Sequence, residues 1–275
     1  MIANMFHLGH KLSPFTEKIL RRISSSHALS DQLSYKDKGE GQLQTELDNY
    51  FDILLRQFVY ECDPGYEIIS EESAPDFSTM KNAWILDPLD GTQNMAMGAP
   101  IFGVALIRVD NGEVTMGAIF LPARKFMGGS GLYVAGKNQG TWEYCPSGRD
   151  RLLQCSTQPD LAKASLLVEG PSKKALTHPA IQKLIRASQR ARTNLSATWS
   201  TILVASGKLQ TKGADILIAV HSKPWDSLIM CLFIEEAGGT VTDLEGNPWT
   251  VKNCANLICS NGLLHTQALA VLKNA

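Results

Sequence analysis

The chain has 275 residues, of which 44% are hydrophobic and 19% are charged, a composition typical of a soluble globular protein. This excludes a disordered, collagen-like or coiled-coil protein. Its 26 Lys and Arg residues against 27 Asp and Glu residues give a net charge of −1, which provides no electrostatic footprint for nucleic acid or anionic lipid.

The six Cys and six His residues form no disulfide or metal pattern. The cysteines contain no C-x-x-C pair, and a chain of this length needs no disulfides, so we expect free thiols in a reducing compartment. His7 and His10 are three residues apart, but no second cluster completes a zinc site. The first residues lack an apolar run of signal-peptide length, and no stretch approaches the ~18 apolar residues of a membrane span, so we expect a cytoplasmic protein without membrane contact.

Apolar spacing predicts a helix over about 13–27, begun by Ser13 and Pro14, and a second helix over about 45–61. Short β-type runs follow at 66–70, 83–86, 102–109 and 114–121, with further strands to about 144. Asp110-Asn111-Gly112 predicts a hairpin turn between the third and fourth runs. The turn-rich segment 145–150 predicts a division into an N-terminal α+β half, residues 1–146, and a C-terminal α/β half, residues 147–275.

Helices and strands alternate in the second half. We expect strands near 165–168, 215–220, 240–242 and 257–259, and helices near 179–189, 198–206 and 227–237, with a final helix after them. Alternation after a strand-rich half predicts an α/β fold of layered sheets covered by helices.

The first of three acidic motifs is Ser70-Glu71-Glu72-Ser73, directly after a predicted strand. Adjacent carboxylates repel each other and lose hydration when enclosed, unless a cation or hydrogen-bond donors compensate. Taken alone, the tetrapeptide is more typical of a solvated loop.

The second motif is Asp87-Pro88-Leu89-Asp90-Gly91-Thr92, at the end of another predicted strand. Pro88 holds Asp87 extended, and the following turn would bring both carboxylates close to the Leu89 carbonyl. Such hard oxygen ligands suit Mg²⁺. A helix that starts at Thr92 would present N–H groups to an anion. A Pro-containing turn capped by Asp explains the motif equally well.

The third motif, Lys223-Pro224-Trp225-Asp226, opens a predicted helix that ends at Gly238 and Gly239. By itself it favours Asp226 as the N-cap of this helix, although a capping carboxylate can also bind a metal. The three motifs together are more specific than any one of them, because strand ends and helix starts are where α/β proteins gather ligands.

Together the motifs resemble the inositol monophosphatase family of Mg²⁺-dependent, lithium-sensitive phosphomonoesterases. The resemblance covers about residues 35–260 and includes Thr45-Glu46-Leu47-Asp48 and Glu236-Ala237-Gly238-Gly239 in the family's order. It implies an inositol monophosphatase/fructose-bisphosphatase-like αβαβα sandwich. It also implies a phosphoric monoester hydrolase that acts on a small phosphorylated metabolite with two to three Mg²⁺ ions, and a homodimer.

The resemblance also implies roles for residues. One Mg²⁺ would be held by Glu71, Asp87 and the Leu89 carbonyl, and a second by Asp87, Asp90 and Asp226, with Glu71 helping to place a weaker third. Thr92 and Asp48 would orient and deprotonate the attacking water, although Asp48 by itself is typical of an exposed helix charge. The implied catalytic residues are Asp48, Glu71 and Thr92, and the implied substrate-binding residues are Gly91, Thr92 and Asp226.

The resemblance implies less specific roles for the basic residues. Lys36 or Lys38 would lie in the mobile loop that closes over the metals. The family's lysine is displaced by one residue from each of them, so the sequence does not decide between the two. Arg192 aligns with a family position near the substrate, although the group that it forms with Lys183, Arg186 and Arg190 is more typical of a solvated helix face.

The expected substrate pocket departs from the family pattern. Ala219 replaces a hydroxyl-binding glutamate, Leu195-Ser196-Ala197-Thr198 replaces Gly-Ser/Thr-Ala-Ala, and extra residues lie around 208–213. A methyl group cannot replace a carboxylate that binds polyol hydroxyls, so we do not expect inositol phosphate to be the best substrate. A sugar, polyol, amino-alcohol or nucleotide phosphate remains possible. The alternatives are a 3′-phosphoadenosine 5′-phosphate or fructose-bisphosphatase-type phosphatase, or a catalytically silent relative that serves as a binding module.

Overall fold

A mixed seven-stranded sheet forms the first part of the fold. The computed structural model describes residues 2–27, 35–39, 42–73, 80–207 and 213–273. In spatial order the sheet contains β3 (Glu67–Ser70), β4 (Asn82–Asp90), β5 (Gly103–Asp110), β6 (Glu113–Phe120), β7 (Leu132–Gly136), β8 (Gly140–Glu143) and β9 (Arg151–Leu152). The hairpin turn predicted between β5 and β6 is confirmed, because Asn111 and Gly112 have φ angles of 53° and 83°, as a two-residue turn requires.

A five-stranded sheet forms the second part. In spatial order it contains β11 (Arg190–Arg192), β10 (Ser165–Glu169), β12 (Ile216–Ala219), β14 (Leu257–Ser260) and β13 (Thr240–Asp243). Because β10 and β12 are parallel, their carboxyl ends meet, and Glu169 lies beside Ala219. A separate hairpin is formed by β1 (Tyr35–Gly39) and β2 (Gln42–Thr45).

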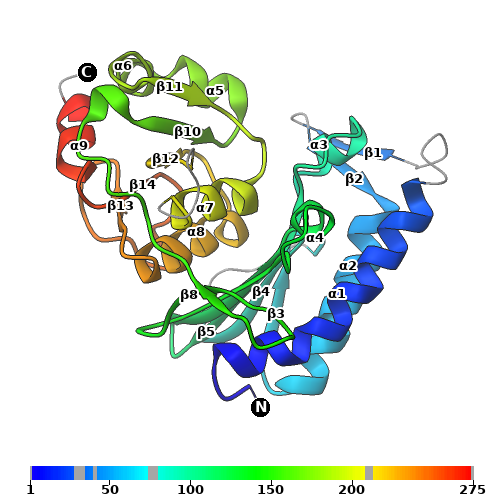
Figure 1. Ribbon diagram of the computed structural model, residues 1–275. Helices are drawn as coiled ribbons and strands as arrows, with labels where there is room; N and C mark the ends of the chain where they lie inside the picture. The colour runs from blue at the N-terminus through cyan, green and yellow to red at the C-terminus, as the bar shows by residue number, and fades with distance from the viewer. Residues whose placement is uncertain (1, 28–34, 40–41, 74–79, 208–212, 274–275) are drawn as a thin grey trace.

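Helices cover both faces of both sheets (Figure 1). One layer, α1 (Met5–His27) and α2 (Glu46–Cys62), packs on the outer face of the seven-stranded sheet. A second layer, α7 (Ala197–Ala205) and α8 (Pro224–Glu236), lies between the sheets. The third layer contains α5 (Ser172–Thr177), α6 (Pro179–Ala187) and α9 (His265–Lys273), and two short helices are α3 (Thr92–Ala96) and α4 (Pro122–Phe126). This order confirms the predicted layered α/β fold.

The sandwich explains why the strands read as continuous apolar runs. In β4, Trp84 and Leu86 pack toward α1 and α2, whereas Ala83 and Ile85 pack into the core around α8. Successive side chains of a strand point to opposite faces, so a strand covered on both sides needs apolar residues at every position.

Helix α1 begins earlier than the sequence predicted. Ser13 and Pro14 predicted its start, and this is wrong, because the helix begins at Met5 and contains Pro14. The Asn4 side chain accepts the His7 N–H at 2.9 Å at the true start. Leu8 and other buried residues of the first turns extend the apolar stripe, and this packing outweighs the local signal.

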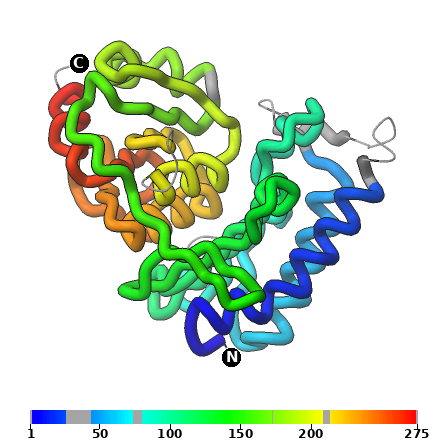
Figure 2. The backbone as a smooth tube through the Cα atoms, viewed as in Figure 1, coloured from blue at the N-terminus to red at the C-terminus, as the bar shows by residue number. Residues whose placement is uncertain are grey.

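The two halves share a core. The chain passes from one sheet to the other through residues 153–164 (Figure 2). Strand β9 still pairs with β8, so the first sheet extends beyond residue 146. Helix α8, from the second half, packs into the core of the first sheet. The division into halves at 146/147 stays a prediction.

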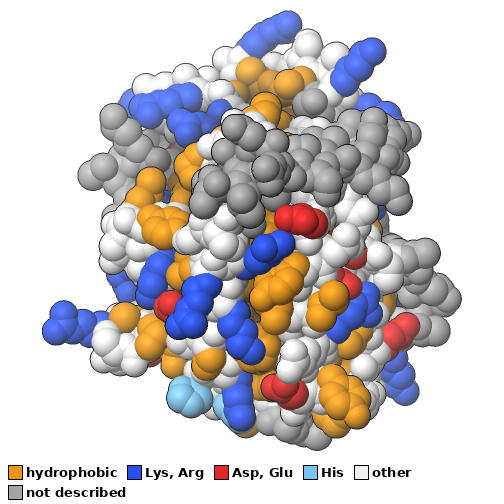
Figure 3. Space-filling model, turned by 90° about the vertical axis from the view of Figure 1, so that its right-hand side faces the viewer, with side chains coloured by type: hydrophobic (Ala, Val, Ile, Leu, Met, Phe, Trp, Pro, Cys, Tyr) orange, Lys and Arg blue, Asp and Glu red, His pale blue; other side chains and the backbone are white. Residues whose placement is uncertain are grey.

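The outer face around α1 and α2 shows basic side chains scattered among apolar ones, with acidic side chains between them (Figure 3). The six cysteines are free thiols, as predicted. Within the described ranges, no helix combines the length and the apolar character that crossing a bilayer requires.

Candidate active site

A bulge in β4 brings Asp87 and Asp90 to the same side of the sheet. Asp87 pairs with Ala105 of β5 and Asp90 with Gly103, so three steps along β4 match two along β5. Residues three apart on a regular strand point to opposite faces, and the extra residue reverses this alternation. Pro88, which has no N–H to donate to the ladder, lies within the bulge.

Asp226 of α8 completes a cluster with these two residues. One carboxylate oxygen from each of Asp87, Asp90 and Asp226 lies within 4.8 Å of the other two. The prediction that Asp226 is the N-cap of its helix is wrong. Lys223 is the N-cap and Pro224 occupies the first turn, so Asp226 lies inside the helix with its carboxylate beside β4.

The environment of Asp87 fits a cation. The side chain is buried, and neither carboxylate oxygen has a hydrogen-bond partner among the described residues. Burial raises the pKa of Asp87 well above its usual value, and the neighbouring charges of Glu71, Asp90 and Asp226 raise it further. Burial raises the pKa of Asp226 in the same way. Grouped buried carboxylates are costly unless a cation neutralises them, and their hard oxygens suit Mg²⁺.

Asp90 is held by the N-terminus of α7. Its carboxylate accepts the backbone N–H groups of Ala197 at 3.0 Å and Thr198 at 2.9 Å. It also accepts the Ser196 hydroxyl at 2.5 Å and the Thr198 hydroxyl. Burial raises the pKa of Asp90, while these donors act in the opposite direction. The sequence predicted neither Ser196 nor Thr198 as a partner of Asp90, although Ser before a predicted helix is a capping signal.

Thr92 and Asp48 form the second part of the site. The Thr92 hydroxyl lies 3.1 Å from Asp48 Oδ1 and 2.8 Å from the Leu89 carbonyl, both of which accept hydrogen bonds. Asp48 Oδ2 accepts the Thr45 N–H at 2.7 Å in the capping box of α2. Asp48 is only 1% exposed, so its interpretation as an exposed helix charge is wrong. The capping box holds one carboxylate oxygen and leaves the other beside Thr92.

Gly91 shapes the turn between β4 and α3. Its φ angle is 83°, and a Cβ at this position would lie 2.7 Å from the Ile101 carbonyl oxygen, so a larger residue does not fit. The predicted helix start at Thr92 is confirmed. Asn94 of α3 donates from Nδ2 to the Asn194 carbonyl at 2.7 Å, which ties this helix to the loop before α7.

Glu71 follows β3, the parallel neighbour of β4. Its backbone N–H donates to the Leu86 carbonyl at 3.2 Å. Its charge contributes to the raised pKa of Asp87 and of Asp226, so it lies close to both carboxylates. Among the described residues, however, Glu71 does not belong to the set whose oxygens lie within 4.8 Å of one another.

The structure describes the basic candidate residues only in part. The β1–β2 hairpin that carries Lys36 and Lys38 contains strand β2, which packs beside α3 (Figure 1). The side chains of both lysines, and residues 208–212 of the predicted extra turn, lie outside the described residues. Arg192 is exposed in β11.

Two neighbouring strand ends lie at the expected substrate pocket. Ala219 is fully buried, and Glu169 lies beside it on β10. Glu169 Oε1 accepts the Asn194 N–H at 3.1 Å and the Ser200 hydroxyl at 2.5 Å, and burial raises the pKa of Glu169 to about 8. Leu195 has a φ angle of 53°, a left-handed conformation that costs a non-glycine residue roughly 1–2 kcal/mol.

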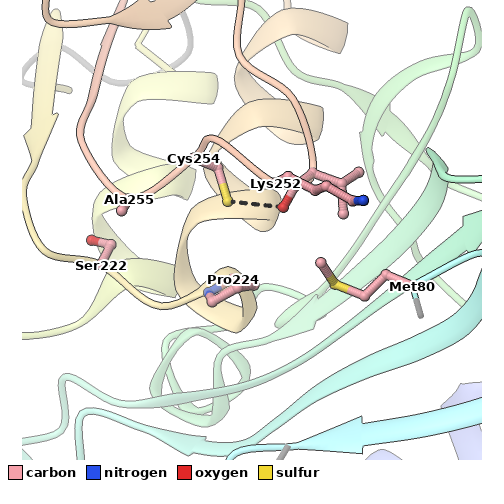
Figure 4. A pocket seen from close by; sticks show the side chains of 7 residues that line it. Met80, Ser222, Pro224, Lys252, Cys254 and Ala255 are labelled. Atoms are coloured by element: carbon pink, nitrogen blue, oxygen red, sulfur yellow. Dashed lines mark hydrogen bonds between the residues drawn. The ribbon is translucent and has the colours of Figure 1, made fainter. Parts of the chain in front are cut away.

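A cavity of about 300 Å³ lies beside the start of α8 (Figure 4). Its lining consists of Met80, Ser222, Pro224, Val251, Lys252, Cys254 and Ala255, and so includes none of the clustered carboxylates. Cys254 Sγ donates to the Val251 carbonyl at 3.6 Å, and burial raises the pKa of this thiol to about 11. A protonated thiol is a poor nucleophile.

A sequence profile of the inositol monophosphatase family matches residues 15–275. A fructose-1,6-bisphosphatase/inositol-1-monophosphatase from Thermotoga maritima is 27% identical over 264 residues, which cover 94% of each chain. A histidinol-phosphatase from Mycobacterium tuberculosis is 26% identical, over 83% of this chain and 84% of its own. The structure of an IMPase/NADP phosphatase complexed with Mg²⁺ and phosphate has a TM-score of 0.79 at 20% identity, over 98% of this chain and 97% of its own, which shows a shared fold. The chain therefore belongs to the inositol monophosphatase family and is a phosphoric monoester hydrolase.

Proposed function

We propose that the protein hydrolyses the phosphate ester of a small metabolite with the help of two to three Mg²⁺ ions. The proposed ligands are Glu71, Asp87, Asp90, Asp226 and the Leu89 carbonyl. The strongest support is the buried Asp87 carboxylate, which has no hydrogen-bond partner among the described residues and lies among other carboxylates. Bound Mg²⁺ would neutralise the phosphate charge, lower the pKa of water and stabilise the leaving alkoxide.

Thr92 and Asp48 are proposed to activate the attacking water. The water would give a proton to Thr92 Oγ1 as this hydroxyl gives its own proton to Asp48 Oδ1, 3.1 Å away. The water oxygen then bonds to phosphorus and the bond between phosphorus and the ester oxygen breaks. The leaving alkoxide takes up a proton from a solvent water, and Asp48 returns its own proton to solvent. We propose that the Gly91 and Thr92 N–H groups, together with Asp226, bind the substrate.

The substrate is proposed to be a sugar, polyol, amino-alcohol or nucleotide phosphate. Ala219 offers no carboxylate to inositol hydroxyls, and Oε1 of the neighbouring Glu169 is occupied by Asn194 and Ser200. This arrangement disfavours inositol phosphate as the best substrate. A catalytically silent relative is disfavoured, because such a protein would be expected to have lost a ligand, whereas every proposed ligand is present.

Phosphate release from a panel of metabolites tests this proposal. The panel includes inositol 1-phosphate, fructose 1,6-bisphosphate, histidinol phosphate, 3′-phosphoadenosine 5′-phosphate and NADP. We expect release from at least one compound with Mg²⁺ and none with EDTA. Release that EDTA does not affect would contradict the metal role, and no release from any compound would contradict the substrate class. We also propose a homodimer, which light scattering tests through the molar mass in solution.

A further inference from the structure

We propose that Asp52 and Arg56 of α2 are positioning residues that hold Glu71 within reach of the carboxylate cluster. The inference rests on the proposed function, in which Glu71 is a Mg²⁺ ligand. Neither residue belongs to the acidic motifs, and both contact the segment that carries Glu71.

Four side chains and one carbonyl form a closed ring of hydrogen bonds, here called the α2 ring. The Ser70 hydroxyl donates to Asp52 Oδ1 at 2.5 Å, and Arg56 Nε donates to Asp52 Oδ2 at 2.6 Å. Arg56 Nη2 donates to Ser73 Oγ at 3.2 Å, and the Ser73 hydroxyl donates to the Ser70 carbonyl at 3.1 Å. The four hydrogen bonds link the side chains into one network, which favours a single arrangement.

The α2 ring fixes both ends of the turn that contains Glu71. Ser70 and Ser73 flank the turn, and the Ser73 N–H donates to the Ser70 carbonyl at 3.1 Å. The Glu72 N–H donates to Ser70 Oγ at 3.3 Å. Ser70 is fully buried and the Asp52 side chain is 14% exposed, whereas the Arg56 side chain is 34% exposed. The hydrogen bond between Ser70 and Asp52 is therefore the best shielded part of the ring.

The same face of α2 serves both parts of the site. Asp48, Asp52 and Arg56 are four residues apart in turn, so they follow one side of the helix. Asp48 contacts Thr92, whereas Asp52 and Arg56 contact the Glu71 turn. Because Glu71 lies outside the tight set of oxygens, the backbone position of its turn decides whether its carboxylate reaches a shared ion. Hydrogen-bond partners that orient metal ligands commonly change metal affinity when they are removed.

Calorimetric titration of the full chain with Mg²⁺ tests the inference. Asp52→Ala and Ser70→Ala should each weaken Mg²⁺ binding about tenfold or more. Asp52→Asn should recover part of the affinity, because its amide oxygen still accepts the Ser70 hydroxyl. The matched control is Gln57→Ala, which removes an exposed 2.8 Å hydrogen bond to Glu61 on the same helix and should leave Mg²⁺ affinity unchanged.

Glu71→Gln separates the inference from the proposed function on which it rests. If Glu71→Gln leaves Mg²⁺ affinity unchanged, the ligand role of Glu71 is wrong and the inference falls with it. If Glu71→Gln weakens binding while Asp52→Ala and Ser70→Ala match the wild type, the α2 ring inference alone is overturned. An equal loss in Gln57→Ala would also overturn it. Unfolding in EDTA shows which variants are folded, and Ser70→Ala decides the matter if Asp52→Ala does not fold.

Discussion

The Asp90 carboxylate accepts the Thr198 backbone N–H at 2.9 Å, a contact between residues 108 positions apart in the sequence. Asp90 thus joins the end of β4 to the start of α7, in addition to its place in the carboxylate cluster. Asp226 reaches the same cluster from the first turn of its own helix, α8. The two aspartates should therefore respond differently to the same substitution.

Asp90→Asn and Asp226→Asn should each lower kcat by about 100-fold or more, because each removes a charge from the proposed metal site. In EDTA the variants should differ in stability. Asp90→Asn places an NH₂ group against backbone donors and should lower the free energy of unfolding by about 1–3 kcal/mol. Asp226→Asn removes an ionisable group from among carboxylates, so it should raise the free energy of unfolding at high pH, where the Asp226 side chain is charged. Steady-state kinetics and urea unfolding check both effects, and near-wild-type turnover in either variant would contradict the assigned roles.

Thr92→Val should lower kcat by about 10²-fold or more while the Mg²⁺ affinity stays close to that of the wild type. The hydroxyl passes a proton to Asp48 in the proposed reaction, and a methyl group cannot. Kinetics combined with calorimetry separates catalysis from metal binding. An unchanged kcat would show that Thr92 does not handle the proton.

The metal-free protein should lose stability as the pH rises. Folding raises the pKa values of Asp87 and Asp226 above their ordinary values, and that of Glu169 to about 8. A carboxyl group whose pKa is raised by folding stabilises the folded state fully below its unfolded pKa, and this stability is lost as the pH rises through the folded pKa. The unfolding temperature in EDTA should therefore fall between about pH 5 and pH 9.

Two additions identify the groups behind this pH dependence. Mg²⁺ should reduce the fall, because a cation stabilises the charged form of the clustered carboxylates. Glu169→Gln should remove the part of the fall that Glu169 causes, which extends from its ordinary pKa up to about pH 8. An unfolding temperature in EDTA that rises over the same range would show that these carboxyl groups are not protonated in the folded protein.

Ala219→Glu should improve the use of inositol 1-phosphate, provided that Glu169 is neutralised. The two positions are neighbours on parallel strands, so a second carboxylate would lie beside a buried first one. We expect Ala219→Glu alone to be destabilised, and the double variant with Glu169→Gln to recover stability and show a lower KM for inositol 1-phosphate. An unchanged KM in a folded double variant would remove the support for position 219 as a specificity determinant.

Local patterns in the sequence predicted the elements with strong apolar periodicity. Helix α2 and the central strands were found because a buried stripe repeats with the period of the element. The start of α1 was misplaced, because Ser13 and Pro14 resemble a helix start. Packing of the turns before Ser13 determines where the helix begins. The β1–β2 hairpin and the short helices α4 and α5 were not predicted, since so few residues carry little periodic signal.

The sequence predicted which acidic residues form the site, but not which other residues contact them. The acidic motifs identified Asp87, Asp90 and Asp226, which the structure brings together. The burial of Asp48, the contacts of Asp90 with Ser196 and Thr198, and the contact of Asp52 with Ser70 depend on pairings between distant segments. No local rule reveals such pairings, because they are set by the register of strands and the packing of helices.

The most direct test is X-ray diffraction from crystals soaked with Mn²⁺ and phosphate, recorded where manganese scatters anomalously. The account predicts at least one anomalous peak among the carboxylates of Asp87, Asp90 and Asp226, with phosphate beside Gly91 and Thr92. Crystals of active protein that contain Mn²⁺ elsewhere and none among these three residues would contradict it.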